Sequence, residues 1–190
     1  MTVAQADLQS LPGVLNRAAL PAALEAAAQA TRASGHPLAL LTLDVDHFRA
    51  FQDEVGPERA DQVLTQLALL LDQLKPATAG LACMGSDEFL LILPNTPLAA
   101  AAALAERLRQ RTAEALAQLG RQPPLTATIG VAASPPGAGW SAQDLLALAD
   151  ARMSFAKKRL HPHHNLVWAG ELPSDWCARL GLRAADWPSL

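Results

Sequence analysis

The stretch that decides the fold is residues 83–93, CMGSDEFLLIL, in which two adjacent acids stand between a Gly-Ser pair and an apolar run. The apolar segments 80–84 and 88–93 flank this Gly-Ser turn, and the pattern predicts a β-hairpin. Asp87 and Glu88 then lie side by side at the mouth of a buried strand. Two carboxylates placed there repel each other and lose solvation unless a cation relieves the cost. The hairpin turn is therefore either a cation-binding site or a solvated turn.

Apolar periodicity and chain-breaking residues predict the remaining elements. The order of elements favours an α+β fold around a split βαβ core, with a mostly antiparallel central sheet and helices on one or both sides. Residues 1–170 are expected to form this domain. Residues 171–190 are a tail that either packs on the body as a short helix or docks a partner. The predicted helices are 19–34, 47–54, 58–74, 98–119 and 141–160, and the further strands are 38–43, 125–132 and 165–168.

Composition narrows the class of protein. The chain has 190 residues, of which 51% are hydrophobic and 17% charged, as expected for a globular domain with a sizeable core. A net charge of −3 gives no electrostatic reason to bind nucleic acid or an anionic membrane. No apolar run approaches the roughly 18 residues of a membrane helix, and the first basic residue is Arg17, unlike a signal peptide. Cys83 and Cys177 lack CxxC spacing, so we expect a cytoplasmic protein with reduced thiols.

A second acidic group follows the strand predicted at 38–43. Asp44 and Asp46 stand at its carboxyl end, and they approach Asp87 and Glu88 if the two strands are neighbours. Carboxylate oxygens are ligands that suit magnesium, which keeps its other positions for water and phosphate. The Gly-Ser turn would let backbone N–H groups approach a phosphate. In the alternative interpretation Asp46 caps the helix that starts at His47, and the acids of the turn are solvated.

Five segments in the same order resemble the GGDEF domain of diguanylate cyclases over roughly residues 8–169. This resemblance implies a ferredoxin-like palm of the nucleotidyl cyclase type. It also implies one GTP per subunit, Mg²⁺ or Mn²⁺ as cofactor, and two subunits that meet face to face to make cyclic di-GMP. The segments are LPGVLNR (11–17), LDVDHFRAFQDEVGPERAD (43–61), GSDEF (85–89), TATIGVA (126–132) and ADARMSFAKK (149–158).

The resemblance also assigns roles to individual residues. A carboxylate at position 61 would suit guanine, which offers two adjacent N–H donors. The lysine at 157 matches the family's phosphate-binding lysine. The implied metal ligands are Asp44, Asp87 and the carbonyl of Val45; the catalytic residues are Asp87, Glu88 and Lys157; the nucleotide-binding residues are Gln52, Asp61, Gly85, Ser86 and Lys157.

Several positions depart from the family pattern, and the departures expected nearest the nucleotide bear most directly on cyclase activity. Ser86 replaces the second signature glycine, Gln52 replaces an asparagine, and His161 replaces a phosphate-contacting arginine. These changes add bulk, shift an amide and remove a permanent charge. They predict impaired cyclase activity; alternatively, the domain is inactive and binds GTP or a sensor or effector protein. Further departures are Cys83 for arginine, Pro57 for histidine and Ser154 for an aromatic residue.

Two other features bear on regulation and on metals. Pro76 and Ala79 stand where the family's product-inhibition motif has arginine and aspartate, so feedback binding of cyclic di-GMP is not expected there. The HPHH run at 161–164 lacks the helical spacing of a metal site and favours a surface turn. The four tryptophans are interpreted as packing residues.

Overall fold

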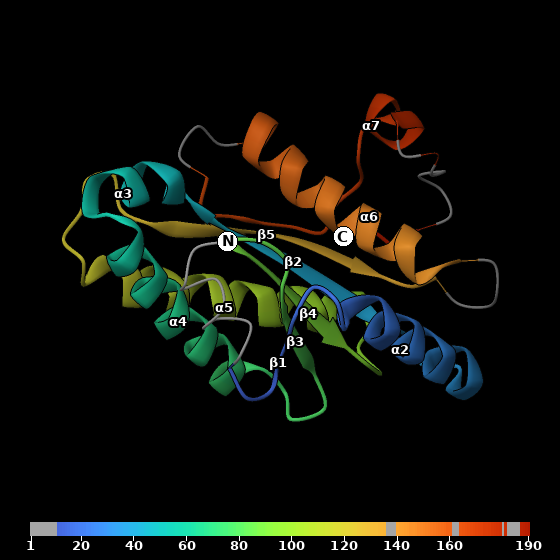
Figure 1. Ribbon diagram of the computed structural model, residues 1–190. Coiled ribbons are helices and arrows are strands. Elements are labelled where there is room, and N and C mark those ends of the chain that lie inside the picture. The colour runs from blue at the N-terminus through green and yellow to red at the C-terminus, as the bar shows by residue number, and fades with distance from the viewer. Residues whose placement is uncertain (1–10, 136–139, 161–163, 180, 182–186) are drawn as a thin grey trace.

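The computed structural model describes residues 11–135, 140–160, 164–179, 181 and 187–190. Its centre is a mixed sheet of six strands in the order β1-β3-β4-β2-β5-β6 (Figure 1). The pairs β3/β4, β4/β2 and β2/β5 are antiparallel, whereas the two edge pairs β1/β3 and β5/β6 are parallel. The strands are β1 (Val14–Leu15), β2 (Ala39–Asp46), β3 (Gly80–Cys83), β4 (Glu88–Leu93), β5 (Thr126–Ala133) and β6 (Val167–Trp168).

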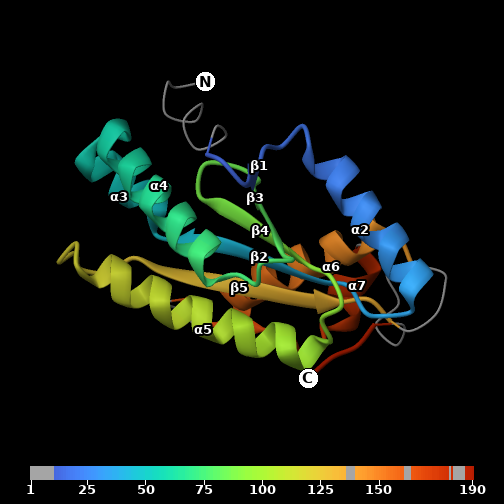
Figure 2. The ribbon, with the colours of Figure 1, turned by 90° about the horizontal axis from the view of Figure 1, so that it is seen from below.

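Helices cover both faces of this sheet, because alternate side chains of each buried strand point to opposite sides. On β2, Leu41 and Leu43 join one core cluster, and Leu40 joins the other. Figures 1 and 2 show α5 and α6 on opposite sides of the sheet. The first cluster lies under α3 (Phe48–Val55), α4 (Pro57–Leu74) and α5 (Leu98–Ala117); the second lies under α2 (Leu20–Ser34), α6 (Ala142–Phe155) and α7 (Ser174–Arg179).

The predicted α+β palm and its hairpin are confirmed, with differences of detail at several elements. The strand expected over 38–43 is β2 (Ala39–Asp46), so Asp44 and Asp46 lie within this strand and not after it. The two-residue strand β1 was not predicted, because two residues carry no periodicity. The helix expected over 141–160 ends as α6 at Phe155 and continues as the π-helical turn η1 (Ala156–Leu160). Ser141 caps α6 as part of a capping box with Asp144, as a serine at this position favours.

The helix α6 lies unusually close to β5, and Gly130 makes this approach possible. A Cβ built on Gly130 would fall 2.0 Å from the carbonyl oxygen of Ala149 and 2.5 Å from the amide nitrogen of Met153. Any larger residue would push α6 away from the sheet. Because η1 continues α6, this contact also fixes the height of η1 above the sheet.

The C-terminal segment packs on the α6 side of the molecule. Leu172 and Cys177 are buried in the second core cluster, and Trp168, Trp176 and Trp187 pack against it. Among the described residues of this tail, Ser174–Arg179 form the short helix α7, which packs on the body. No described helix is long and apolar enough to cross a membrane.

Candidate active site

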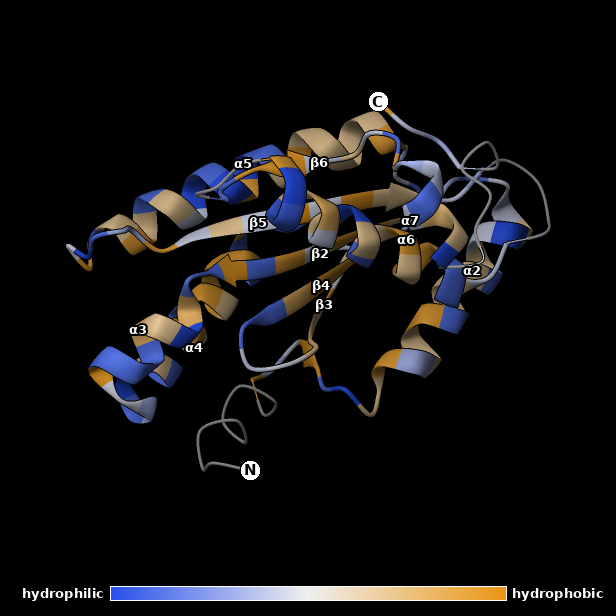
Figure 3. Ribbon diagram, turned by 90° about the horizontal axis from the view of Figure 1, so that it is seen from above, coloured by the Kyte–Doolittle hydropathy of each residue, from blue (hydrophilic) through white to orange (hydrophobic). Residues whose placement is uncertain are grey.

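The predicted acidic residues of β2 and of the hairpin turn lie at one end of the sheet. Asp44 on β2 and Glu88 on β4 are direct register partners across the antiparallel ladder. The amide nitrogen of Val45 donates to the carbonyl oxygen of Asp87 at 3.1 Å, which ties the end of β2 to the turn. In the hydropathy colouring of Figure 3, the α3 ends of β2 and β4 are hydrophilic while the rest of these strands is mainly apolar.

Lys157, which lies on η1, places a positive charge next to this acidic group. Its ammonium forms an ion pair with Oδ1 of Asp44 and lies 3.8 Å from Oδ1 of Asp46. The side chains of Lys157 and Asp44 are only 22% and 15% exposed, so water screens this pair weakly. The lysine expected to bind phosphate is therefore held beside the carboxylate expected to bind the metal.

The acidic group carries more negative charge than its described cations offset. Burial raises the pKa of Asp44 to about 6, and Asp87 and Asp46 add to this rise although Lys157 opposes it. Burial also raises the pKa of Glu88, with further contributions from the charges of Asp150 and Asp87. A site with this balance favours binding of a further cation.

The signature turn itself is exposed, and its serine contacts its aspartate. The hydroxyl of Ser86 donates to Oδ1 of Asp87 at 2.7 Å. Gly85 is also exposed, and a Cβ placed there would come within 3.5 Å of the Glu88 carboxylate, an ordinary contact. The substitution at position 86 thus adds a hydroxyl that occupies one oxygen of an expected metal ligand.

Asp46 does not cap α3, so this expectation was wrong. The cap position is His47, which has a left-handed backbone with φ of 62°, and no side chain caps this helix end. The Asp46 side chain is fully buried and accepts hydrogen bonds from the hydroxyls of Thr126 and Thr128 and from the amide of Asn165. It is a structural acid beneath the site, since its carboxylate joins β2, β5 and the segment before β6.

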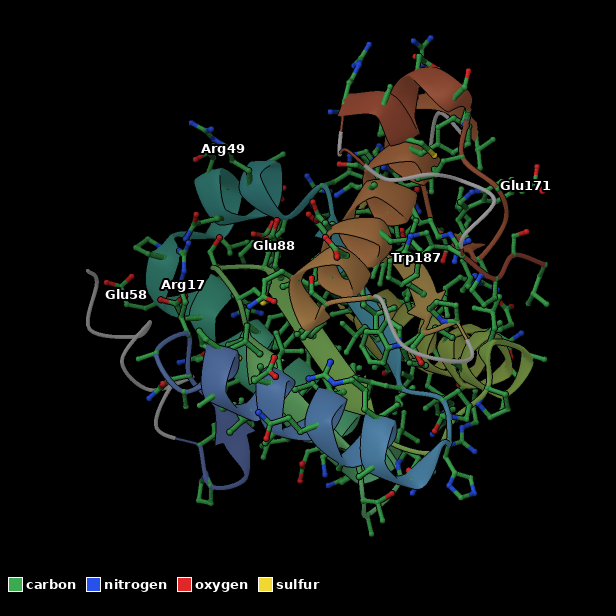
Figure 4. All side chains as sticks on the ribbon, turned by 90° about the vertical axis from the view of Figure 1, so that its right-hand side faces the viewer. Arg17, Arg49, Glu58, Glu88, Glu171 and Trp187 are labelled. Carbon is green, nitrogen blue, oxygen red and sulfur yellow. The ribbon has the colours of Figure 1, made fainter. Side chains whose placement is uncertain are left out.

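The two residues expected to read guanine lie on the helices that follow β2. Gln52 is half-buried in α3, and its backbone carbonyl oxygen accepts a hydrogen bond from the backbone amide of Gly56. Asp61 is buried in α4 at 7% exposure. Arg49 of α3 and Glu58 at the start of α4 are labelled on the same side of the view as Glu88 in Figure 4.

The other positions that differ from the family pattern differ from one another in burial and in their surroundings. Burial raises the pKa of the Cys83 thiol to about 11, so this side chain is a neutral core residue. Pro57 occupies the first turn of α4, where a missing N–H costs nothing. Pro76 is exposed and Ala79 is buried, and neither offers a charge to a ligand. His161 lies outside the described residues.

Three ionisable residues close to the acidic group were missed by sequence reasoning. Asp150 on α6 and Arg17 before α2 both act on the pKa of Glu88, in opposite directions. His164 lies with Nδ1 3.4 Å from Oδ1 of Asp46. Asp150 and Arg17 both fall within resembling segments and could have been suspected, whereas the position of His164 depends on how distant segments pack.

The donor set fits a magnesium ion better than a transition metal. Among the described residues, no three His, Cys, Asp or Glu side chains are arranged to hold a metal. The ligands that the resemblance implies, Asp44, Asp87 and the carbonyl of Val45, would offer two carboxylates and a backbone oxygen. Mg²⁺ typically binds one or two carboxylates and completes its shell with water and phosphate oxygens, so this oxygen-only set suits it.

This sheet topology, with paired acids at a hairpin turn beside a lysine, defines a palm of the nucleotidyl cyclase type. The sequence matches the family "Diguanylate cyclase, GGDEF domain" over residues 6–161, and the chain belongs to this family. It is also 34% identical, over 109 residues, to a diguanylate cyclase of Vibrio cholerae serotype O1; the match covers 57% of this chain and 34% of that protein.

Solved structures give the same result for the fold. The active GGEEF domain of a diguanylate cyclase from Vibrio cholerae superposes with a TM-score of 0.72 at 27% identity, covering 80% of this chain and 94% of that one. The GGDEF domain of DgcB from Caulobacter crescentus, in complex with c-di-GMP, has a TM-score of 0.72 at 26% identity, covering 81% and 90%. The chain spans between 19% and 36% of the length of curated relatives in Bacillus, Caulobacter and Vibrio.

Proposed function

We propose that this chain is a diguanylate cyclase-type domain that condenses two GTP into cyclic di-GMP with Mg²⁺, at a reduced rate. The observation that carries the proposal is the meeting of Asp44, Asp87 and Lys157 at one end of the sheet, with a buried Asp44–Lys157 ion pair. These residues come from three distant segments, and each has the chemistry that its assigned role needs. Burying this many carboxylates at one end of a sheet costs free energy, and a purely structural role would not require it.

In this proposal the two carboxylates and the Val45 carbonyl hold the metal. When bound, Mg²⁺ would neutralise triphosphate charge and lower the pKa of the attacking 3′-hydroxyl. Lys157 would donate to a phosphate oxygen and stabilise the negative charge that develops there. Glu88, whose pKa is raised by burial and by Asp150, would accept the proton of the 3′-hydroxyl from beside the metal ligands.

Guanine recognition is assigned to Asp61 and Gln52 in the same proposal. The Asp61 carboxylate would accept from adjacent N–H groups of the base, and the amide of Gln52 would complete the contact. The side chain of Gln52 is one methylene longer than asparagine, which moves its amide outward from α3. Gly85 and Ser86 would lie against the phosphates, where the turn's backbone N–H groups face solvent.

One observation favours a second candidate, an inactive domain that binds GTP or a partner. The Ser86 hydroxyl already donates to Oδ1 of Asp87 at 2.7 Å, so this ligand oxygen must exchange one bond for another when metal binds. Each lost or displaced charge-assisted bond costs on the order of 1–3 kcal/mol, and two or three such losses together could take several decades off the rate.

The reaction joins two nucleotides and therefore needs two active-site halves, so we propose that the chain forms a homodimer at least transiently. Control by a sensor or effector protein is also proposed. Among similar structures, the diguanylate cyclase SiaD of Pseudomonas aeruginosa is in complex with its activator SiaC; SiaD shares 29% identity with this chain.

The deciding experiment is product chromatography after incubation of the concentrated protein with GTP and either Mg²⁺ or Mn²⁺. An Asp87→Ala variant serves as the blank, and GTP binding is measured on both proteins by calorimetry. Cyclic di-GMP formed only by the wild type supports the cyclase. GTP binding without product supports the inactive domain that binds GTP, and neither binding nor product overturns the cyclase and leaves only the partner-binding form of the second candidate.

A further inference from the structure

Lys157 lies in a π-helical turn, and the geometry of this turn depends on the contacts around it. The turn η1 (Ala156–Leu160) is π-helical, with i→i+5 hydrogen bonds, and such turns are rare and frequently occur at functional sites. A π turn shifts the side chains that follow it relative to a regular α-helix. The direction of the Lys157 side chain toward β2 therefore relies on contacts that hold this turn.

Trp176 of α7 supplies contacts on both sides of Lys157 along the chain. Its ring meets the ring of Phe155 edge to face, with centroids 5.3 Å apart. The Lys158 ammonium lies 5.8 Å from the centroid of the Trp176 ring, a cation–π contact. One tail residue thus contacts the residue before η1 and the residue directly after Lys157.

The tail that carries Trp176 is itself anchored to α6 by a buried charge. The Arg152 guanidinium, 2% exposed, donates to the carbonyl oxygens of Val131 at 2.8 Å and Pro188 at 2.7 Å. Burial lowers the pKa of Arg152 to about 10. Because Pro188 supplies one acceptor, detaching the tail would leave a buried guanidinium under-satisfied.

Trp187 provides a natural contrast within the same tail. It packs on the second core cluster and borders a small cavity with Leu148, Arg152 and Cys177. In Figure 4 it lies on the side of α6 away from Glu88. Trp187 therefore contributes to tail packing, whereas Trp176 also reaches the segment that carries Lys157.

We propose that Trp176 is a positioning residue that holds η1 so that the Lys157 ammonium reaches Asp44 and Asp46. Its consequence for catalysis rests on the proposed function, but the positioning itself does not. The tail is then part of the site's support, and loss of the Trp176 ring releases Lys157 from its ion pair while the sheet stays intact.

The chain has three lysines, Lys75, Lys157 and Lys158, which makes lysine reactivity a direct test. The nucleotide-free protein is acetylated briefly with acetic anhydride, and each site is quantified by peptide mass spectrometry. Lys75 is the internal reference, since it pairs with Asp72 on α4, on the opposite face of the sheet. The readout is the ratio of Lys157 to Lys75 acetylation in four proteins: wild type, Trp176→Ala, Trp176→Phe and Trp187→Ala.

We expect Trp176→Ala to raise this ratio at least fivefold, Trp176→Phe to restore most of the wild-type value, and Trp187→Ala to leave it within twofold. An unchanged ratio in Trp176→Ala, or an equal rise in Trp187→Ala, overturns the proposal. Circular dichroism checks the fold, and Trp176→Leu replaces the alanine variant if that protein does not fold.

The acetylation test uses no nucleotide, so its outcome is independent of cyclase activity. A raised ratio in a protein that makes no cyclic di-GMP supports the positioning role and counts against the proposed function alone. Where the wild type is active, Trp176→Ala should lower kcat in an otherwise wild-type chain and should lower it no further in a Lys157→Ala background. Additive losses in that double variant would contradict a role exerted through Lys157.

Discussion

Lys157 and Asp44 form a largely buried ion pair although they are 113 residues apart in sequence. The pair joins η1 to the end of β2. It brings the lysine that is expected to bind phosphate into contact with the aspartate that is expected to bind the metal. In the absence of nucleotide, the lysine thus partly balances the acidic group. Binding of Mg²⁺ and GTP would replace this internal pairing by pairing with ligands of the opposite charge.

The first prediction concerns the stability cost of Asp44. Burial raises its pKa from 3.8 to about 6, so the folded state retains a proton that the unfolded chain loses as pH rises through this window. The stability contribution of Asp44 is therefore highest below about pH 4 and is lost by about pH 6. We expect Asp44→Asn to become more stable relative to wild type, by about 1–3 kcal/mol, between pH 4.5 and pH 7.5.

Urea denaturation at both pH values measures this change. Asp53→Asn, an exposed substitution on α3, is the matched control and should show no pH-dependent gain. A stability difference between Asp44→Asn and wild type that is the same at both pH values would show that Asp44 is not destabilised by its burial.

The hairpin and the helices were predictable because their signals are local. The Gly-Ser turn between two apolar runs located β3 and β4, and the apolar stripe of α4 gave its extent to within a residue. The break in the apolar run located Asp44 near the carboxyl end of β2, although this strand continues to Asp46. These features depend on residues close together in sequence, where periodicity and turn chemistry act directly.

The environment of Asp46 and the packing of the tail were not predictable in the same way. An aspartate before a helix is most simply a cap, yet the backbone turns at His47 and sends Asp46 inward to Thr126 and Thr128. The contact between Arg152 and Pro188 likewise joins segments whose pairing no local pattern encodes. Long-range hydrogen bonds decided both outcomes.

The second prediction tests the structural role of Asp46. Removing its carboxylate would leave the hydroxyls of Thr126 and Thr128 and the amide of Asn165 without this acceptor in a buried setting. We expect Asp46→Ala to lower the free energy of unfolding by about 2–4 kcal/mol. Chemical denaturation measures the loss; Asp53→Ala should stay within about 0.5 kcal/mol of wild type. An equal, small effect of both variants would contradict a structural role.

The third prediction tests Lys157 as the phosphate-binding cation. Because a charge-assisted hydrogen bond to phosphate is lost, Lys157→Ala should weaken GTP binding or lower kcat/KM by about 10–100-fold. Lys75→Ala removes the same charge and an ion pair with Asp72 far from the site, and should leave both quantities within about twofold. Calorimetry with GTP and Mg²⁺ gives the affinity, and product chromatography gives the rate. Similar losses in the two variants would remove the specific role of Lys157.

The fourth prediction separates the two ways in which Ser86 can impair the site. Its hydroxyl donates to Oδ1 of Asp87, and its Cβ adds bulk where the phosphates are proposed to lie. Ser86→Ala removes only the hydroxyl, whereas Ser86→Gly removes both and restores a flexible backbone. If the bond to Asp87 is the main handicap, both variants should raise the initial rate of cyclic di-GMP formation by about tenfold, the equivalent of one hydrogen bond.

If bulk or backbone restriction is the handicap, only the glycine variant should gain activity. The Mg²⁺ dependence distinguishes the cases further, because freeing an Asp87 oxygen should lower the Mg²⁺ concentration needed for half-maximal rate. Both variants are compared with Ser154→Ala, which changes another departure from the family pattern outside the signature turn. No gain in either Ser86 variant would place the loss of activity elsewhere, and the altered amide of Gln52 would be the next position to restore.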